Sequence, residues 1–187
     1  ERSAAGRPRP GPPALRGEAS VDALIIEQLC RRGHSAAALL WARRGEHQFD
    51  RAERLAAWAA AIRDRQQAAA TKTLDTALAD QAPSVQAVVH ARLALLAAAS
   101  GNPAAATESI ARANQVLEQC PEIRTVALGN LKQTFLLPID DVSGWWMKVR
   151  AQAELIGALC LLGKTDDARQ VFPDALASAR SWILRST

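Results

Sequence analysis

The stretch that decides the fold is AASGNPAAATESIA, residues 98–111, in which Gly101 ends an Ala- and Leu-rich run and Ala106 follows five residues later. Two further stretches repeat this spacing: LCRRGHSAAALLWA (29–42) with Gly33 and Ala38, and CLLGKTDDARQVFP (160–173) with Gly163 and Ala168. A glycine lets the chain turn sharply after a helix, because it adopts positive φ angles without steric cost. A small side chain one turn into the next helix lets the two backbones approach closely. The repeated pair therefore predicts a series of helical hairpins.

The rest of the sequence has the pattern of helices. We expect them over 21–32, 36–44, 54–65, 67–81, 85–100, 103–119, 145–162 and from 165 onward, with a shorter and less regular one over 122–136. The expected helix caps are Ser35, Asp50 with Glu53, Ser84, and Asn102 with Pro103. No run of alternating β-branched residues indicates a strand, so the expected fold class is all-α.

In each hairpin, the residues of the second helix that contact the first helix are expected at steps of three or four residues after the glycine, because such residues lie on one face of a helix. We call each such row of residues a seam. The expected seams are Ala106, Ile110, Ala113 and Leu117 after Gly101; Ala168, Phe172, Ala175 and Ala179 after Gly163; and Ala70, Leu74 and Ala77 after Arg65, which stands where a third glycine would. Pro173 inside the last helix is expected to kink or restart it.

These features resemble the tetratricopeptide repeat, a helix–turn–helix unit of about 34 residues that stacks into a superhelix. Gly33 and Gly101 lie 68 positions apart, which is two such periods, and the best single match is residues 153–179. The chain departs from the family's pattern between 121 and 144, where the spacing is irregular, and it lacks the aromatic signature of the first helix. The resemblance implies stacked antiparallel hairpins, a tetratricopeptide-like α-solenoid.

In that family the first helix of each hairpin lines a concave groove. Carried onto this sequence, the groove would be lined by Val88, Ala91, Leu95, Ala98, Arg150, Ala153, Gly157 and Cys160. A small, apolar lining favours an amphipathic helix as the occupant, supplied either by a partner protein or by this chain's own residues 122–136. Both occupants remain open at this point. Trp145, adjacent to Trp146, is a candidate exposed contact, because neighbouring helical residues point about 100° apart.

Residues 1–20 differ in composition from the remainder and predict a Pro-, Gly- and Arg-rich arm or linker before a single domain over 21–187. The arm carries a net charge of +2 (four Arg against two Glu) of the chain's +4, so the body is nearly balanced. Aromatic residues make up only 4% of the sequence, and the two facts together argue against nucleic-acid binding. Because the chain starts with Glu rather than Met, we expect a fragment or a processed product.

Chemistry-bearing motifs are absent from the sequence. It has no phosphate-binding glycine loop, H-E-x-x-H helix or G-x-S-x-G elbow, and its three cysteines lack the spacing of a metal or dithiol site. We therefore expect no cofactor, metal or small-molecule ligand and no enzymatic activity. Unpaired cysteines favour a reducing, cytoplasmic location, and a nuclear location stays possible. No apolar run in the sequence is long enough to span a membrane.

Two functions follow as hypotheses. The first is a non-catalytic protein–protein interaction module, acting as a scaffold or as the sensor part of a larger protein. The alternative is a small all-α enzyme or ligand-binding domain with a pocket near Asp140, Trp145 and Arg150. An enzyme requires ionisable side chains that converge in a cleft, whereas a module requires an apolar groove. The tryptophans at 41, 58, 146 and 182 lie on apolar helix stripes, so they are expected in the core.

Overall fold

The computed structural model describes residues 21–44, 48–63, 67–120 and 139–186, and these residues form eight helices and no strand. The helices are α1 (Val21–Arg31), α2 (Ser35–Arg43), α3 (Gln48–Arg63), α4 (Gln67–Leu78), α5 (Pro83–Ala99), α6 (Pro103–Gln119), α7 (Ile139–Leu161) and α8 (Thr165–Ser186). The prediction of an all-α fold is confirmed. The expected arm over 1–20 and the expected helix over 122–136 lie outside the described residues. No helix in the described part combines the length and apolar character needed to cross a bilayer.

The three predicted glycine turns share one backbone geometry. Gly33, Gly101 and Gly163 have φ angles of 87°, 73° and 73°, in the left-handed region that favours glycine. In each turn the residue after the glycine donates its N–H to a carbonyl five positions back, at 2.9 Å in all three cases. This hydrogen bond is the mark of the Schellman motif, which satisfies carbonyls left free at a helix end. A local signal in the sequence is therefore sufficient to fix these three corners.

Helix starts were predicted less well than helix ends. The expected cap at Asn102 is confirmed, because its side chain accepts a hydrogen bond from the Ala105 N–H at 3.1 Å. The expected caps at Ser35 and Ser84 are wrong, since α2 starts at Ser35 after His34 and α5 starts one residue before Ser84. Asp50 is not a cap either. It lies in the first turn of α3, where a carboxylate is favourable at the positive end of the helix.

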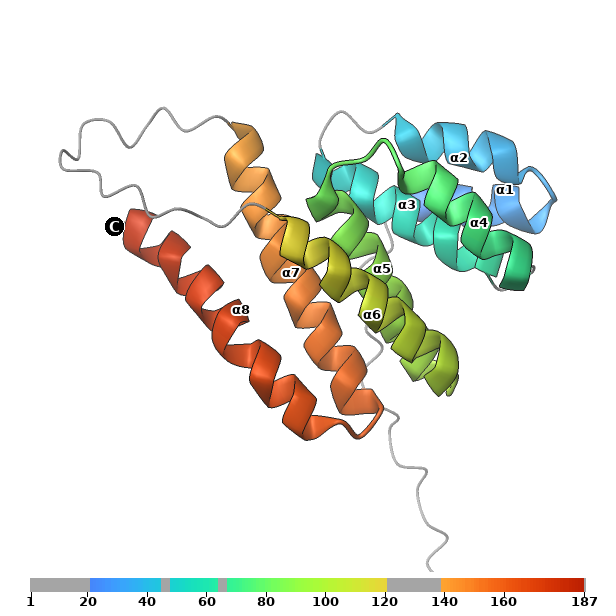
Figure 1. Cartoon of the computed structure of the whole chain (residues 1–187). Helices are drawn as coiled ribbons and strands as arrows, with labels where there is room; N and C mark the ends of the chain where they lie inside the picture. The colour runs from blue at the N-terminus through green and yellow to red at the C-terminus, as the bar shows by residue number, and fades with distance from the viewer. Residues whose placement is uncertain (1–20, 45–47, 64–66, 121–138, 187) are drawn as a thin grey trace, which may run out of the picture.

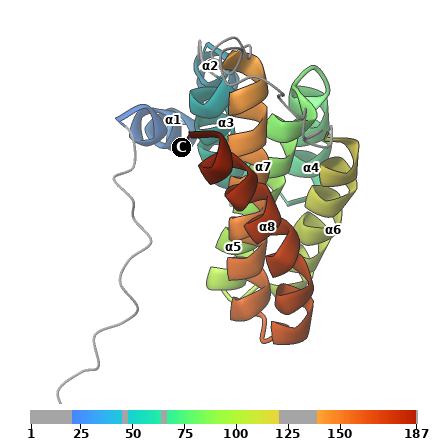
Figure 2. The same ribbon diagram turned by 90° about the vertical axis from the view of Figure 1, so that its left-hand side faces the viewer.

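Helices that follow one another along the chain pack as neighbours in four pairs, and the pairs lie side by side (Figure 1). Figure 2 places α1 and α5 on one side of the molecule and α4 and α6 on the other. We call α1, α3, α5 and α7 the first layer, because α1 packs against α3, α3 against α5, and α5 against α7. Helix α5 contacts α3 and α7 within that layer and α6 outside it. Apolar residues accordingly cover it on nearly all sides, as expected for a helix buried on more than one face.

The small residues one turn beyond the glycines are buried as predicted. Ala38 and Ala106 are fully inaccessible to solvent and Ala168 is nearly so, and Ile110 and Ala113 continue the predicted seam of α6. The predicted seam of α8 is wrong at Phe172, which is 54% exposed, while the preceding Val171 packs against the core. Pro173 lies inside α8, which runs as one helix from Thr165 to Ser186.

Candidate functional site

The residues predicted to line a groove lie in the first layer but do not form one open surface. Val88 and Ala91 are buried in the core, so a partner reaches them only if the helix packing opens. Leu95 is half-buried because it packs on α7, where a Cβ added at Gly157 would come within 3.2 Å of the Leu95 Cδ1. Along α7, Ala153 is exposed. The side chains of Ala98 and Arg150 are half-buried, and Cys160 is exposed.

Two large apolar side chains that the sequence reasoning missed lie at the edge of this layer. Leu96 of α5 is 44% exposed and Leu161 of α7 is 53% exposed. Helices α5 and α7 run in the same direction past each other, because Arg92 faces Glu154 and Leu95 faces Gly157. The same register places Leu96 level with Ala158, and Leu161 lies three residues further along α7, so both leucines fall toward the C-terminal end of the α5–α7 surface.

Four ionised side chains connect three helices of the first layer. Arg92 of α5 makes two hydrogen bonds to Glu154 of α7, at 2.7 and 3.0 Å, and lies 3.7 Å from Glu53 of α3. Arg150 of α7 pairs with Glu53 and, one turn along its own helix, with Glu154 at 3.1 Å. We call these four residues the charge cluster. Its two cations and two anions balance, and the Glu154 side chain is nearly buried.

The charge cluster acts as a fixed set of ion pairs and not as an acid–base pair. Burial alone would lower the pKa of Arg92, but Glu154 and Glu53 stabilise its charged form so strongly that the pKa is raised. A guanidinium with a raised pKa does not release a proton near neutral pH. Arg150, which the sequence placed in a possible pocket with Asp140 and Trp145, pairs with the carboxylates of Glu53 and Glu154; the side chains of Asp140 and Trp145 lie outside the described residues, so the pocket stays a prediction.

The tryptophans divide between core and surface. Trp58 is buried and donates its indole N–H to the Ser35 carbonyl at 3.0 Å, as expected for a core tryptophan with a polar handle. The core prediction is wrong for Trp41 and Trp146, which are 39% and 50% exposed. Trp41 donates to the Asp22 carboxylate at 3.3 Å across the first hairpin. The side chain of Trp182 lies outside the described residues.

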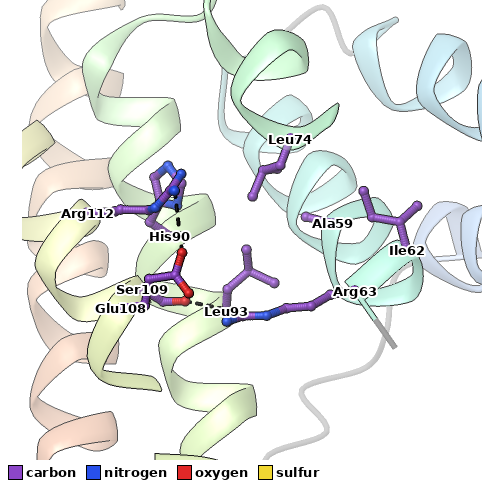
Figure 3. A pocket seen from close by; sticks show the side chains of 9 residues that line it. All are labelled: Ala59, Ile62, Arg63, Leu74, His90, Leu93, Glu108, Ser109 and Arg112. Carbon is purple, nitrogen blue, oxygen red and sulfur yellow. Dashed lines mark hydrogen bonds and ion pairs between the residues drawn. The ribbon is translucent and has the colours of Figure 1, made fainter. Parts of the chain in front are cut away.

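A hollow opens on the other side of α5, between α3, α4, α5 and α6 (Figure 3). Its volume of about 20 Å³ gives room for a single water molecule. Both polar and apolar side chains line it: Ala59, Ile62, Arg63, Leu74, His90, Leu93, Glu108, Ser109 and Arg112. The two arginines approach from opposite sides, Arg63 from α3 and Arg112 from α6 (Figure 3).

The arginines of the hollow already have partners. Arg63 donates to the Ser109 hydroxyl at 2.7 Å and to the Ala105 carbonyl at 3.0 Å, which are both neutral acceptors. Arg112 pairs with Asp75 of α4 and, at 3.4 Å, with Glu108 one turn back on α6. These contacts attach α6 to α3 and α4, and they hold the Ser109 hydroxyl in a structural role, since it also donates to the Ala105 carbonyl at 2.9 Å.

His90 is the one titratable group of the hollow that is deeply buried, with 5% of its surface exposed. Burial and the positive charges of Arg112 and Arg63 lower its pKa to about 4, against a smaller opposing effect of Asp75. The imidazole is therefore neutral at pH 7, with one donor and one acceptor nitrogen. The described residues contain no group of three or more His, Cys, Asp or Glu arranged to hold a metal ion.

Comparisons of the chain with models of known protein families, with curated proteins and with solved structures found no match.

Proposed function

We propose that the chain is a non-catalytic protein-interaction module, built from stacked hairpins in the manner of the tetratricopeptide repeat, that holds an amphipathic helix of a partner protein against its first layer. The observation that carries the proposal is the pair of leucines exposed on the same end of α5 and α7, Leu96 and Leu161. Clustered apolar surface of this kind is characteristic of binding sites in soluble proteins.

The surroundings of the two leucines support a helical partner. Ala153 precedes Leu161 on α7, is exposed and carries only a methyl group, so a partner can approach the α7 backbone closely there. An amphipathic helix presents large apolar residues at three- and four-residue spacing, which suits a surface that alternates small and large side chains. The charge cluster flanks this surface and is neutral overall, so it adds a polar border without selecting a partner of one charge.

The ionisable groups of the described residues support a non-catalytic role. The charge cluster contains two arginines and two carboxylates that neutralise each other. The hollow beside His90 has room for a single water molecule, whereas sites for small-molecule substrates measure several hundred Å³. We therefore favour the interaction module over a small all-α enzyme or ligand-binding domain.

The experiment is a selection of helical peptides from a displayed library on the whole chain, followed by affinity measurements with variants. Leu96→Glu and Leu161→Glu place a carboxylate on the proposed surface. Phe172→Glu is the matched control, because Phe172 of α8 has the same exposure as Leu161, 54% against 53%. We expect selected peptides with apolar residues at helical spacing, and we expect their affinity to fall at least about tenfold in the leucine variants alone.

Two results would contradict the proposed function. The first is a selection that enriches no peptide with helical apolar spacing. The second is a set of enriched peptides that bind Leu96→Glu and Leu161→Glu as tightly as they bind the original chain. Far-ultraviolet circular dichroism of each variant shows whether the helices are retained, and this separates a lost surface from a lost fold.

A further inference from the structure

The first hairpin, α1 with α2, ends the row of helix pairs on the side opposite α8 (Figure 1). In the described part of the chain it carries five of the nine large apolar side chains that are exposed: Val21, Leu24, Ile25, Leu40 and Trp41. The last hairpin of a helical stack normally presents a polar outer face, which keeps the protein soluble. Because this hairpin presents apolar side chains instead, its outer side is suited to an interface.

The exposed apolar residues of α1 form one face of the helix. Val21, Leu24, Ile25 and Gln28 are all exposed and follow one another at helical spacings of three and four residues. Ile26, which is fully buried, lies two residues beyond Leu24, a rotation of about 200° around the helix. We call Val21, Leu24, Ile25 and Gln28 the outer face of α1. This face points away from the core.

The outer face of α1 is complementary to a second copy of itself. A two-fold interface brings the same patch of both copies together, so like charges on the patch would repel each other. None of the four residues of the outer face is ionised. The charged residues of α1 have partners within the chain, since Asp22 accepts a hydrogen bond from Arg54 at 2.6 Å and Glu27 pairs with Arg31.

The opposite end of the row does not complement this face. Over residues 165–177 of α8, Phe172 is the one large apolar side chain that is exposed. Asp166, Asp167 and Arg169 are exposed on the same helix. A head-to-tail stack of copies would press the outer face of α1 against these charged groups and remove their water, which is costly. Apolar surface meets apolar surface only when two first hairpins face each other.

The arm that precedes α1 does not complement the face either. Among residues 1–20, Leu15 is the only large apolar residue, and four of the twenty are prolines. Proline is unfavourable inside a helix, and one leucine does not supply apolar side chains at helical spacing. The composition of the arm therefore favours a second copy of the chain as the occupant.

We propose that two copies of the chain associate through their first hairpins, with the outer faces of their α1 helices packed around a two-fold axis. Leu24 and Ile25, in the middle of the face, lie nearest the axis. Helix α1 has 11 residues and is about 16 Å long, so the contact is small. Interfaces near the lower limit of about 1,000 Å² are weak, and we expect a dissociation constant in the micromolar range.

The test is sedimentation velocity of the whole chain from low to several hundred micromolar concentration. We expect the mass to rise with concentration from 20.0 kDa toward twice that value. Leu24→Glu places a carboxylate in the middle of both faces and should raise the dissociation constant at least about tenfold. Phe172→Glu is the matched control at the opposite end, with an exposure of 54% against 51% for Leu24, and should leave association unchanged.

A charge exchange tests the two-fold arrangement itself. Leu24→Lys should weaken association as Leu24→Glu does, because each variant brings two like charges together. An equal mixture of the two variants should recover the pairing, since the axis places position 24 of one copy close to position 24 of the other. Circular dichroism shows whether each variant keeps its helices, and the same exchange at Ile25 replaces it if a Leu24 variant does not fold.

The proposal is independent of the proposed partner surface, because α3 lies between α1 and α5 in the first layer. Leu96→Glu should leave the association of copies unchanged, and Leu24→Glu should leave peptide binding unchanged. A chain that sediments as a monomer at every concentration overturns the proposal and assigns the outer face of α1 to a helix of another protein. Association of Leu24→Glu equal to that of the original chain, or a mixture that pairs no better than each variant alone, overturns it as well.

Discussion

Ala106 is the position at which the close approach of paired helices can be tested most directly. It lies in the first turn of α6, it is fully buried, and it faces α5 after the turn at Gly101. Replacing its methyl group by the isobutyl group of leucine inserts volume into a seam that has no space for it. Overpacking of this kind costs about 1–3 kcal/mol. Ala104, in the same turn of the same helix, is exposed and provides the matched control.

The expected outcome is a clear difference between the two variants. Ala106→Leu should lower the free energy of unfolding by about 1–3 kcal/mol, which for a chain of this size corresponds to a fall in melting temperature of about 2–12 °C. Ala104→Leu should stay within about 0.5 kcal/mol of the original chain. Urea unfolding, followed by circular dichroism and by tryptophan fluorescence, measures both stabilities. Equal stabilities of the two variants would show that the small side chain is not what lets the helices approach.

Three further predictions concern stability. In the same urea assay, Gly101→Ala should lower the free energy of unfolding by about 1–2 kcal/mol, because position 101 has a positive φ. Gly144→Ala, inside α7 with space for a Cβ, should instead raise it by up to about 1 kcal/mol. Glu154→Gln should cost about 1.5–3 kcal/mol, since it leaves Arg92 without its bidentate partner, and added salt should diminish the difference; an unchanged urea midpoint would refute this. The pKa of His90 lies at about 4 in the folded state and 6.5 in the unfolded state, so the unfolded state takes up the proton first as the pH falls, and the stability present above pH 6.5 is lost toward pH 4. Between pH 7 and 5 this loss should be about 2 kcal/mol, and His90→Gln should abolish it; parallel pH profiles of the two proteins would contradict the assignment.

The parts of the fold that the sequence predicted are those that depend on a few neighbouring residues. Each glycine turn needs one residue with positive φ and one small residue a turn later, and both requirements are visible in a short window. The seam of α8 was predicted wrongly at Phe172 because steps of three and four residues are equally compatible with a helix face. The structure takes the step of three, from Ala168 to Val171. The pattern of apolar residues alone does not decide between a step of three and a step of four residues.

The candidate site was less accessible to sequence reasoning, for two physical reasons. Apolar residues cover nearly all sides of α5, so periodicity does not reveal that Val88 and Ala91 face the core while Leu96 faces solvent. The ion pair of Arg92 and Glu154 joins residues 62 positions apart, and this pairing depends on how α5 and α7 are placed. A charged residue inside an otherwise apolar helix, as at Arg92, was the available signal that another helix supplies a counter-ion.

The central position of α5 has a consequence for synthesis on the ribosome. Its last residue, Ala99, leaves the ribosome 40 positions ahead of the first residue of α7, Ile139, an interval of several seconds at about 5–20 residues per second. During that time the α7-facing flank of α5 is uncovered and available to chaperones that bind nascent apolar segments. A ribosome-bound chain that stops at residue 138 should therefore recruit such chaperones more strongly than one that extends past α7, and equal recruitment by the two stalled chains would show that this flank is covered in another way.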